Sequence, residues 1–168
     1  KDNLFLKNRY NVLFLDLNLQ EPGEYFLRKG VYSLKNVNIG AGVKLNIESG
    51  SILKMEQGYG NFNIYGSISA IGEKNNPIVF VSINDNEYEN VESNFGFKHD
   101  FWAGIHIRSS EKSIFDNCIF KFGARRDNDL NGVINIEDSN NIIIQNSTFK
   151  ENYYAIKIKN SKNININN

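Results

Sequence analysis

The chain has 168 residues, enough for one domain with a sizeable core, and it carries 19 basic and 19 acidic residues. This balance gives no electrostatic reason to expect nucleic acid or an anionic membrane as a partner. The single cysteine, Cys118, excludes an internal disulfide framework. No apolar run approaches the roughly 18 residues of a membrane span, and 13 Gly with two Pro favour many tight turns over long helices.

The first thirty residues differ from the rest of the chain. Leucines alternate with other residues from Leu13 to Leu19, which predicts one strand with an apolar face, and Glu21-Pro22-Gly23 ends it. Because a repetitive stack needs a distinct cover at its end, residues 1–30 are predicted to form an N-terminal cap. The chain opens at Lys1 without an initiator Met or the apolar region of a signal peptide, so we expect a mature or excised piece.

Short alternating segments follow one another after the predicted cap. Their spacing of two residues is typical of strands with one buried face, and Gly-rich turns separate them. Lys54 is predicted to point outward between two inward residues. The positions predicted to point inward are Val37, Ile39, Val43, Leu45, Ile47, Leu53, Met55, Phe62, Ile64, Ile68 and Ala70.

The C-terminal third of the chain repeats itself. Ile105-His106-Ile107 returns 29 residues later as Ile134-Asn135-Ile136, which returns 22 residues later as Ile156-Lys157-Ile158. A polar loop around 124–130 accounts for the longer interval. A period of about 20–25 residues, built from short period-2 strands, is typical of a β-solenoid.

The repeat also predicts columns of side chains on successive rungs. Arg108, Glu137 and Lys159 occupy equivalent positions, so opposite charges should alternate along the axis as a surface ion-pair ladder. Asn117 and Asn146 share another column, which predicts stacked amides at a turn rather than a glycosylation acceptor at Asn146.

The order of four segments is also informative. These segments are Ile39–Met55, Ile64–Gly72, Asn76–Phe80 and Trp102–Ile105. Their order resembles that of the right-handed parallel β-helix modules of the pectate-lyase-like superfamily, which occur in microbial surface and secreted proteins. The resemblance covers residues 31–168 and implies an all-β, right-handed single-stranded parallel β-helix (solenoid) with insertions at 84–101 and 122–131. Because this superfamily includes lyases, galacturonases, phage tailspikes and non-catalytic adhesins, the fold does not choose the function.

The catalytic residues of enzymes with this fold are mostly missing. Galacturonases carry an Asn-Thr-Asp, a paired Asp-Asp, a His-Gly and an Arg-Ile-Lys, of which only Lys157-Ile158-Lys159 has a faint counterpart. Glycoside hydrolysis needs two carboxylates about 5 to 10 Å apart. Lyases of this fold use an acidic calcium cluster, and the candidates 84–92 and 125–129 depart from the EF-hand spacing. We therefore expect no catalytic residue, metal or cofactor, while calcium binding by the first loop stays open.

Aromatic and basic residues gather in the two insertions and beside them. Aromatic rings stack on sugar rings, and guanidinium groups donate to hydroxyl or carboxylate oxygens. The alternative is that these aromatics fold back as small local cores. Tapirin cellulose adhesins similarly carry aromatics on a β-helix. The residues predicted to bind carbohydrate are Tyr88, Phe95, Phe97, Phe101, Trp102, Arg125 and Arg126.

Together these patterns favour a non-catalytic module, extracellular or at the cell surface, that serves attachment or binds a polysaccharide such as cellulose. The alternatives are a polysaccharide lyase or hydrolase of the same superfamily, and a structural spacer in a larger surface protein. The last repeat stops at Asn168, before the Phe that follows in the earlier copy, so we expect further rungs or another domain beyond the C-terminus.

Overall fold

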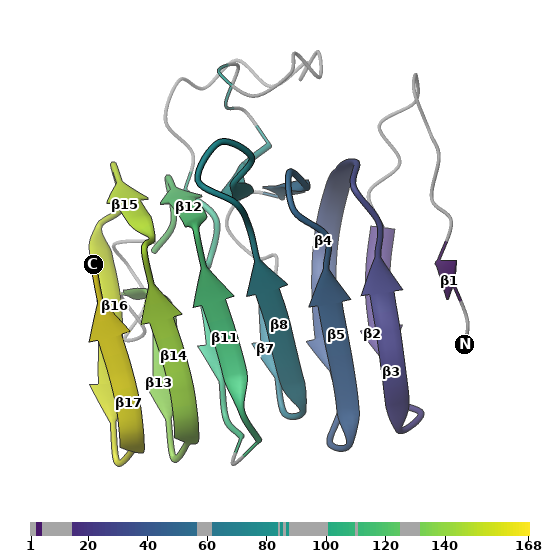
Figure 1. The fold of residues 1–168 in the computed structure, drawn as a ribbon, viewed down its shortest axis with the longest axis vertical. Helices are drawn as coiled ribbons and strands as arrows, with labels where there is room; N and C mark the ends of the chain where they lie inside the picture. The colour runs from purple at the N-terminus through teal and green to yellow at the C-terminus, as the bar shows by residue number, and fades with distance from the viewer. Residues whose placement is uncertain are drawn as a thin grey trace.

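The computed structural model describes residues 3–4, 15–56, 62–83, 85, 87, 101–109, 111–124 and 132–168. Within them all regular structure is β-strand, and the pairings between named strands are parallel (Figure 1). The prediction of an all-β chain is confirmed for this part. None of the described segments is a helix long and apolar enough to cross a membrane.

Seventeen strands are present in the described residues, and they form two sheets. The seven-stranded sheet has the order β1-β3-β5-β8-β11-β14-β17, and the ten-stranded sheet the order β15-β12-β9-β6-β4-β7-β10-β13-β16, with β2 beside β4. The strand bounds are β1 Asn3–Leu4, β2 Leu15–Leu19, β3 Gly23–Leu27, β4 Val31–Ile39, β5 Val43–Ile47, β6 Ile52–Met55, β7 Phe62–Ile64, β8 Ser67–Ile71, β9 Ile78–Ser82, β10 Ile105–Ile107, β11 Ser113–Asp116, β12 Cys118–Lys121, β13 Gly132–Glu137, β14 Asn140–Gln145, β15 Thr148–Lys150, β16 Tyr154–Lys159 and β17 Lys162–Asn167.

The long strand β4 divides the ten-stranded sheet into two arms. Its first half pairs with β6 and its second half with β7. We call β6, β9, β12 and β15 the first arm, and β2, β7, β10, β13 and β16 the second arm. From β6 onward the chain visits the first arm, the second arm and the seven-stranded sheet in turn, and we call each such circuit a rung. This arrangement is compatible with the predicted parallel β-helix.

The predicted register is confirmed in the C-terminal rungs. Ile105 pairs with Ile134, and Ile134 pairs with Ile156, which are the intervals of 29 and 22 residues seen in the sequence. The first strands, β1 to β3, and the last strands, β15 to β17, lie at opposite ends of the stack (Figure 1). The register therefore fixes which side chains share a column.

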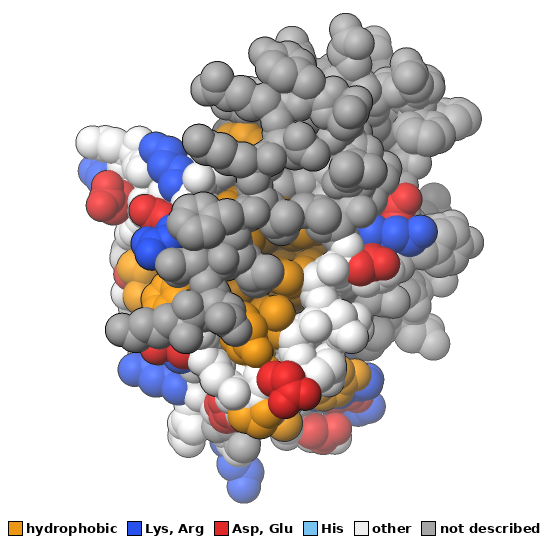
Figure 2. All heavy atoms as spheres, turned by 90° about the vertical axis from the view of Figure 1, so that its right-hand side faces the viewer, with side chains coloured by type: hydrophobic (Ala, Val, Ile, Leu, Met, Phe, Trp, Pro, Cys, Tyr) orange, Lys and Arg blue, Asp and Glu red, His pale blue; other side chains and the backbone are white. Residues whose placement is uncertain are grey.

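The core lies between the two arms and the seven-stranded sheet. All the residues predicted to point inward between Val37 and Ala70 are buried. Phe80, Phe120 and Phe149 stack in one column, with successive ring centroids 5.0 Å apart. Figure 2, which faces the β2–β3 end, shows hydrophobic side chains in the centre with charged side chains around them.

The predicted N-terminal cap needs correction. Leu15–Leu19 forms β2, which pairs with β4, and Gly23–Leu27 forms β3, which pairs with β5. Leu17, Leu19 and Leu27 are buried in the same core as the later rungs. Their alternation matches that of the later rungs, so β2 and β3 extend the two sheets rather than form a separate cover. Residues 5–14 of the predicted cap lie outside the described residues.

Turns between strands use left-handed residues in matching columns. Asn117 and Asn146 have φ of 48° and 49°, as expected for asparagine at such a turn. The two amides were predicted to bond each other directly. Instead, both side-chain Nδ2 groups donate to Asp116 Oδ1, at 3.0 Å from Asn117 and 2.9 Å from Asn146. Direct amide-to-amide bonds occur in other columns, such as Asn63 Nδ2 to Asn38 Oδ1 at 3.0 Å.

The left-handed conformation of Asn117 predicts how substitutions there change the free energy of unfolding. Asn117→Ala should lower the free energy of unfolding by about 1–2 kcal/mol more than Asn117→Gly, because a Cβ in the left-handed region carries that cost and glycine does not. Both variants lose the same bond to Asp116, so the comparison isolates the backbone. Urea unfolding measures the difference, and equal losses would contradict the backbone explanation.

Candidate functional site

Trp102, the largest of the predicted sugar-binding aromatics, belongs to the core. Its side chain is 0% exposed, and its Nε1–H donates to the Lys121 carbonyl oxygen at 3.0 Å. A ring enclosed in this way cannot present a face to a ligand. The prediction that Trp102 stacks on a sugar is therefore corrected by the structure.

Phe101 is half-buried beside the first arm. Its ring lies edge-on to Phe122, with centroids 6.3 Å apart, and Lys121 Nζ lies 4.7 Å from the Phe122 centroid. For Phe101 the structure thus supports the alternative of a small local core, whereas Trp102 belongs to the main core. The other predicted binding residues, Tyr88, Phe95, Phe97, Arg125 and Arg126, lie outside the described residues.

A group of charges centred on the buried Lys121 and Asp85 lies on the first arm. Lys121 Nζ lies 2.8 Å from Asp85 Oδ2, pairs with Glu87, and is 3.5 Å from Glu151. Lys54, predicted to point outward into solvent, is instead fully buried and donates to the Asp85 carbonyl oxygen at 3.0 Å. We call these five residues the lysine cluster.

The charges of the lysine cluster stabilise one another. Burial disfavours the Lys121 ammonium, but hydrogen bonds to Asp85 and Glu87 outweigh that penalty and raise the pKa of Lys121. A permanently protonated lysine with carboxylates bound to it is a poor proton acceptor. The cluster therefore ties Asp85 and Glu87 to the first arm rather than offering a general base.

A strip of polar side chains runs along the outer face of the second arm. Asn38, Asn63 and His106 are register partners on successive strands and alternate with core residues. The adjacent outward column begins with Tyr65, just after β7, and continues through Arg108, Glu137 and Lys159. Neighbouring strands are about 4.8 Å apart, so each column presents a polar group at that interval. We call these seven residues the polar strip.

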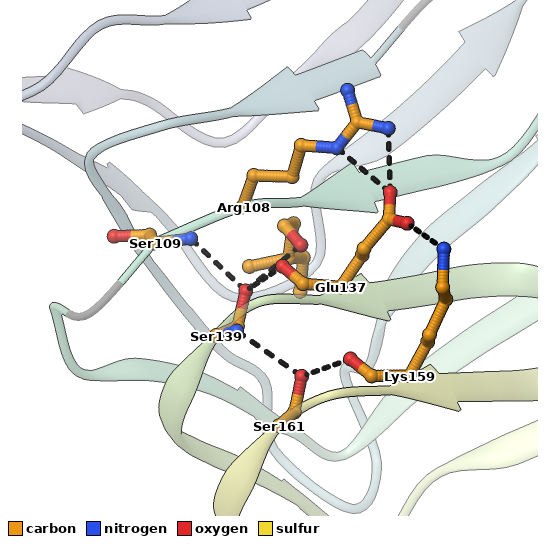
Figure 3. A network of polar contacts seen from close by, with 7 residues as sticks. Arg108, Ser109, Glu137, Ser139, Lys159 and Ser161 are labelled. Carbon is orange, nitrogen blue, oxygen red and sulfur yellow. Dashed lines mark hydrogen bonds and ion pairs between the residues drawn. The ribbon is translucent and has the colours of Figure 1, made fainter.

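The predicted ion-pair ladder of Arg108, Glu137 and Lys159 is confirmed (Figure 3). Arg108 donates from both Nε, at 3.0 Å, and a terminal nitrogen to Glu137 Oε2. Lys159 Nζ donates to the other carboxylate oxygen at 2.8 Å. Glu137 thus bridges two cations on neighbouring rungs, which fixes the side chains of the second column.

A serine ladder beside these charges was not predicted. The Ser109 backbone N–H donates to Ser139 Oγ at 3.0 Å, and the Ser139 N–H donates to Ser161 Oγ at 3.1 Å (Figure 3). The Ser139 and Ser161 hydroxyls each donate to the carbonyl oxygen two residues earlier, of Glu137 and Lys159 respectively. The repeat of Ser139 at Ser161 was the available signal, since a turn residue that repeats in register can bond along the axis.

The strip holds its titratable groups in fixed charge states. Hydrogen bonds from Lys159 and Arg108 lower the pKa of Glu137 to about 2. Burial and the nearby Arg108 lower the pKa of His106 against the opposing effect of Glu137. At neutral pH the strip therefore presents a carboxylate that only accepts hydrogen bonds and a neutral imidazole that can both donate and accept. A sugar hydroxyl both donates and accepts hydrogen bonds, so it can pair with either group.

The Glu137 pKa gives a pH prediction. Because this pKa is lowered in the folded state, the stabilisation by its ion pairs is complete above the unfolded value near 4.5 and is lost as pH falls through about 2. A carboxyl-detected NMR titration should place the Glu137 midpoint near 2, and Lys159→Ala should move the midpoint upward. A midpoint near 4.5 in the unmodified chain would contradict the ladder.

The remaining chemistry of the described residues is limited. No group of three or more His, Cys, Asp or Glu side chains in that part of the chain is placed to hold a metal ion. Cys118 is buried, and burial raises the pKa of its thiol, so the thiolate form is disfavoured. Comparison of the chain with protein-family models, with curated proteins and with solved structures finds no match.

Proposed function

We propose that the chain is a right-handed parallel β-helix that binds a linear, hydroxyl-rich polysaccharide along the polar strip. In this role it is a non-catalytic extracellular module for attachment to a glycan surface, with cellulose as one possible target. The observation that carries the proposal is the polar strip itself. Its amide, imidazole, phenol, guanidinium and carboxylate groups stand in two in-register columns on the outer face of the second arm.

The spacing of the strip suits an extended glycan that lies parallel to the stack. The polar groups recur at about 4.8 Å, which is comparable to the length of one sugar ring in a β-linked chain. Tyr65 is 46% exposed, so its ring is open to a sugar face while its hydroxyl can bond a sugar hydroxyl. Arg108 is also exposed, and its pKa is raised by hydrogen bonding to Glu137 and further by Tyr65.

The proposal favours binding over glycoside hydrolysis. A hydrolase needs one carboxyl group that is protonated near neutral pH and can donate to the leaving oxygen. The ion-pair ladder lowers the pKa of Glu137, because two cations hold its carboxylate ionised, so Glu137 is not such a proton donor. Glu137 is then suited to accept hydrogen bonds from hydroxyl groups and to orient Arg108 and Lys159.

Pull-down on insoluble and soluble polysaccharides tests this function. Tyr65→Ala combined with His106→Ala should weaken retention about threefold to tenfold per lost hydrogen bond. Tyr153→Ala is the matched control, since Tyr153 is 43% exposed and lies off the strip. Retention of the double variant at the unmodified level would remove the proposal. Release of sugar products during incubation would favour the lyase or hydrolase alternative instead.

A further inference from the structure

Charges of opposite sign alternate along the second column of the polar strip. Arg108 directly follows β10, Glu137 ends β13 and Lys159 ends β16, and ion pairs join both cations to Glu137. Because neighbouring strands are about 4.8 Å apart, the two cations stand about 10 Å apart, with one carboxylate midway between them. The outer face thus carries a charge pattern that spans two strand intervals.

The carboxylate is the recessed member of this pattern. The Glu137 side chain is 18% exposed, whereas the Arg108 side chain is 51% exposed. Strand β10 pairs with β7 on one side and β13 on the other, so Arg108 is exposed although its strand lies inside the stack. Figure 3 shows one terminal nitrogen of Arg108 turned toward Glu137 and the other turned away from it. A ligand over this column therefore contacts the guanidinium directly and reaches the carboxylate through small groups such as a hydroxyl.

Neighbouring charged residues repeat the same alternation strand by strand. Lys157 adds a positive charge on the same strand as Lys159. Asp138 is exposed and directly follows β13, so it adds a negative charge at that level. His106 on β10 is neutral at neutral pH because burial lowers its pKa, so Arg108 supplies the charge there. The three strands thus present positive, negative and positive charge in turn.

We propose that the glycan bound along the polar strip is acidic, and that the carboxylates facing the strip lie two sugars apart. This inference rests on the function proposed above and names the class of glycan. A β-linked chain parallel to the stack has about one sugar per strand interval, so carboxylates at every second sugar recur at about 10 Å and face Arg108 and Lys159. The sugar between them offers hydroxyl groups to Glu137. The planar guanidinium can hold a carboxylate through two parallel hydrogen bonds, and the complementary charges fix the register of the chain.

A hexasaccharide of hyaluronan is the probe, because it is β-linked and every second sugar carries a carboxylate. The same hexasaccharide with its carboxyl groups reduced to alcohols is the matched neutral ligand, and cellohexaose is a second neutral ligand. At low ionic strength the acidic hexasaccharide should bind the whole chain about threefold to tenfold more tightly than either neutral one, because two exposed ion pairs are added. Added salt should remove most of this difference, since exposed charges are screened. Titrations followed by backbone amide NMR give each Kd.

Two variants test whether Arg108 and Lys159 bind the carboxylates. Arg108→Gln and Lys159→Gln should each lower the preference for the acidic over the reduced hexasaccharide about twofold to threefold, and the double variant should abolish it. Both side chains are exposed, so the fold should survive. Lys44→Gln is the matched control that should keep the preference, because Lys44 also pairs with a carboxylate, that of Glu24, and is 49% exposed on the seven-stranded sheet.

The outcomes separate this inference from the function on which it rests. Equal affinity for the acidic and the reduced hexasaccharide, or tighter binding of cellohexaose, would overturn the inference and leave the proposed glycan binding standing. A preference that Lys44→Gln lowers as much as Arg108→Gln does would also overturn it. If none of the three hexasaccharides shifts the amides of the polar strip, the inference and the proposed function both fail.

Discussion

Replacing Trp102 by alanine should lower the free energy of unfolding by about 3–5 kcal/mol, the range for truncating a large buried aromatic side chain. The side chain is fully buried, and its indole N–H satisfies the Lys121 carbonyl. The variant therefore leaves a cavity and removes one buried hydrogen bond. Denaturant unfolding at constant m-value measures the loss.

Trp102→Phe separates the two contributions to that loss. Phenylalanine keeps much of the ring but removes the donor to Lys121, so about 0.5–1.5 kcal/mol should be lost with this hydrogen bond. Phe101→Ala serves as a neighbouring control, since its ring is only partly buried and should cost less than Trp102→Ala. A loss under about 1 kcal/mol for Trp102→Ala would return this residue to the surface and revive its predicted role in sugar stacking.

Lys121→Met should cost a similar amount, about 3–5 kcal/mol, because it removes one partner of a buried ion pair. The Asp85 carboxylate is almost fully buried and lies 2.8 Å from the Lys121 ammonium. Without that charge the carboxylate stays in a low-dielectric site, where the Glu87 backbone N–H donates to its Oδ1 at 2.7 Å. Thermal or urea unfolding should show the loss with little dependence on salt, since buried pairs are weakly screened.

A double variant checks the cause of this loss. Adding Asp85→Leu to Lys121→Met removes the uncompensated charge and should recover much of the stability, as replacement of buried ion pairs by apolar groups often does. Lys159→Met is the exposed counterpart, since its side chain is 60% exposed, and should cost much less. If Lys121→Met and Lys159→Met cost the same, the buried pair of Lys121 and Asp85 does not stabilise the fold as proposed.

The repeat in the sequence predicted the register but not which outward residues are buried. Intervals of 22 and 29 residues placed Arg108, Glu137 and Lys159 in one column, because parallel strands keep equivalent residues adjacent. Alternation also assigned Lys54 to the outer face. It could not show that Asp85 covers Lys54, since that contact comes from a residue 31 positions away in a segment without a repeat.

The burial of Trp102, and the column formed by Asn38, Asn63 and His106, were not predicted for a similar reason. Trp102 lies outside the named strands and is buried through a bridge to Gly123 on the following circuit. Asn63 and His106 are register partners, but the first insertion separates them in the sequence and breaks the period. Contacts made across irregular segments depend on tertiary packing, which a local pattern does not encode.

The central claim is that a linear glycan lies along the polar strip, and a series of soluble oligosaccharides of increasing length tests it directly. Amide NMR shifts should be confined to the residues of the polar strip and their neighbours on β4, β7, β10, β13 and β16. The Kd should fall with each added sugar until the oligosaccharide spans the strip and then stay constant. A monosaccharide that binds as tightly as the longest oligosaccharide, or shifts confined to the first arm, would contradict the account.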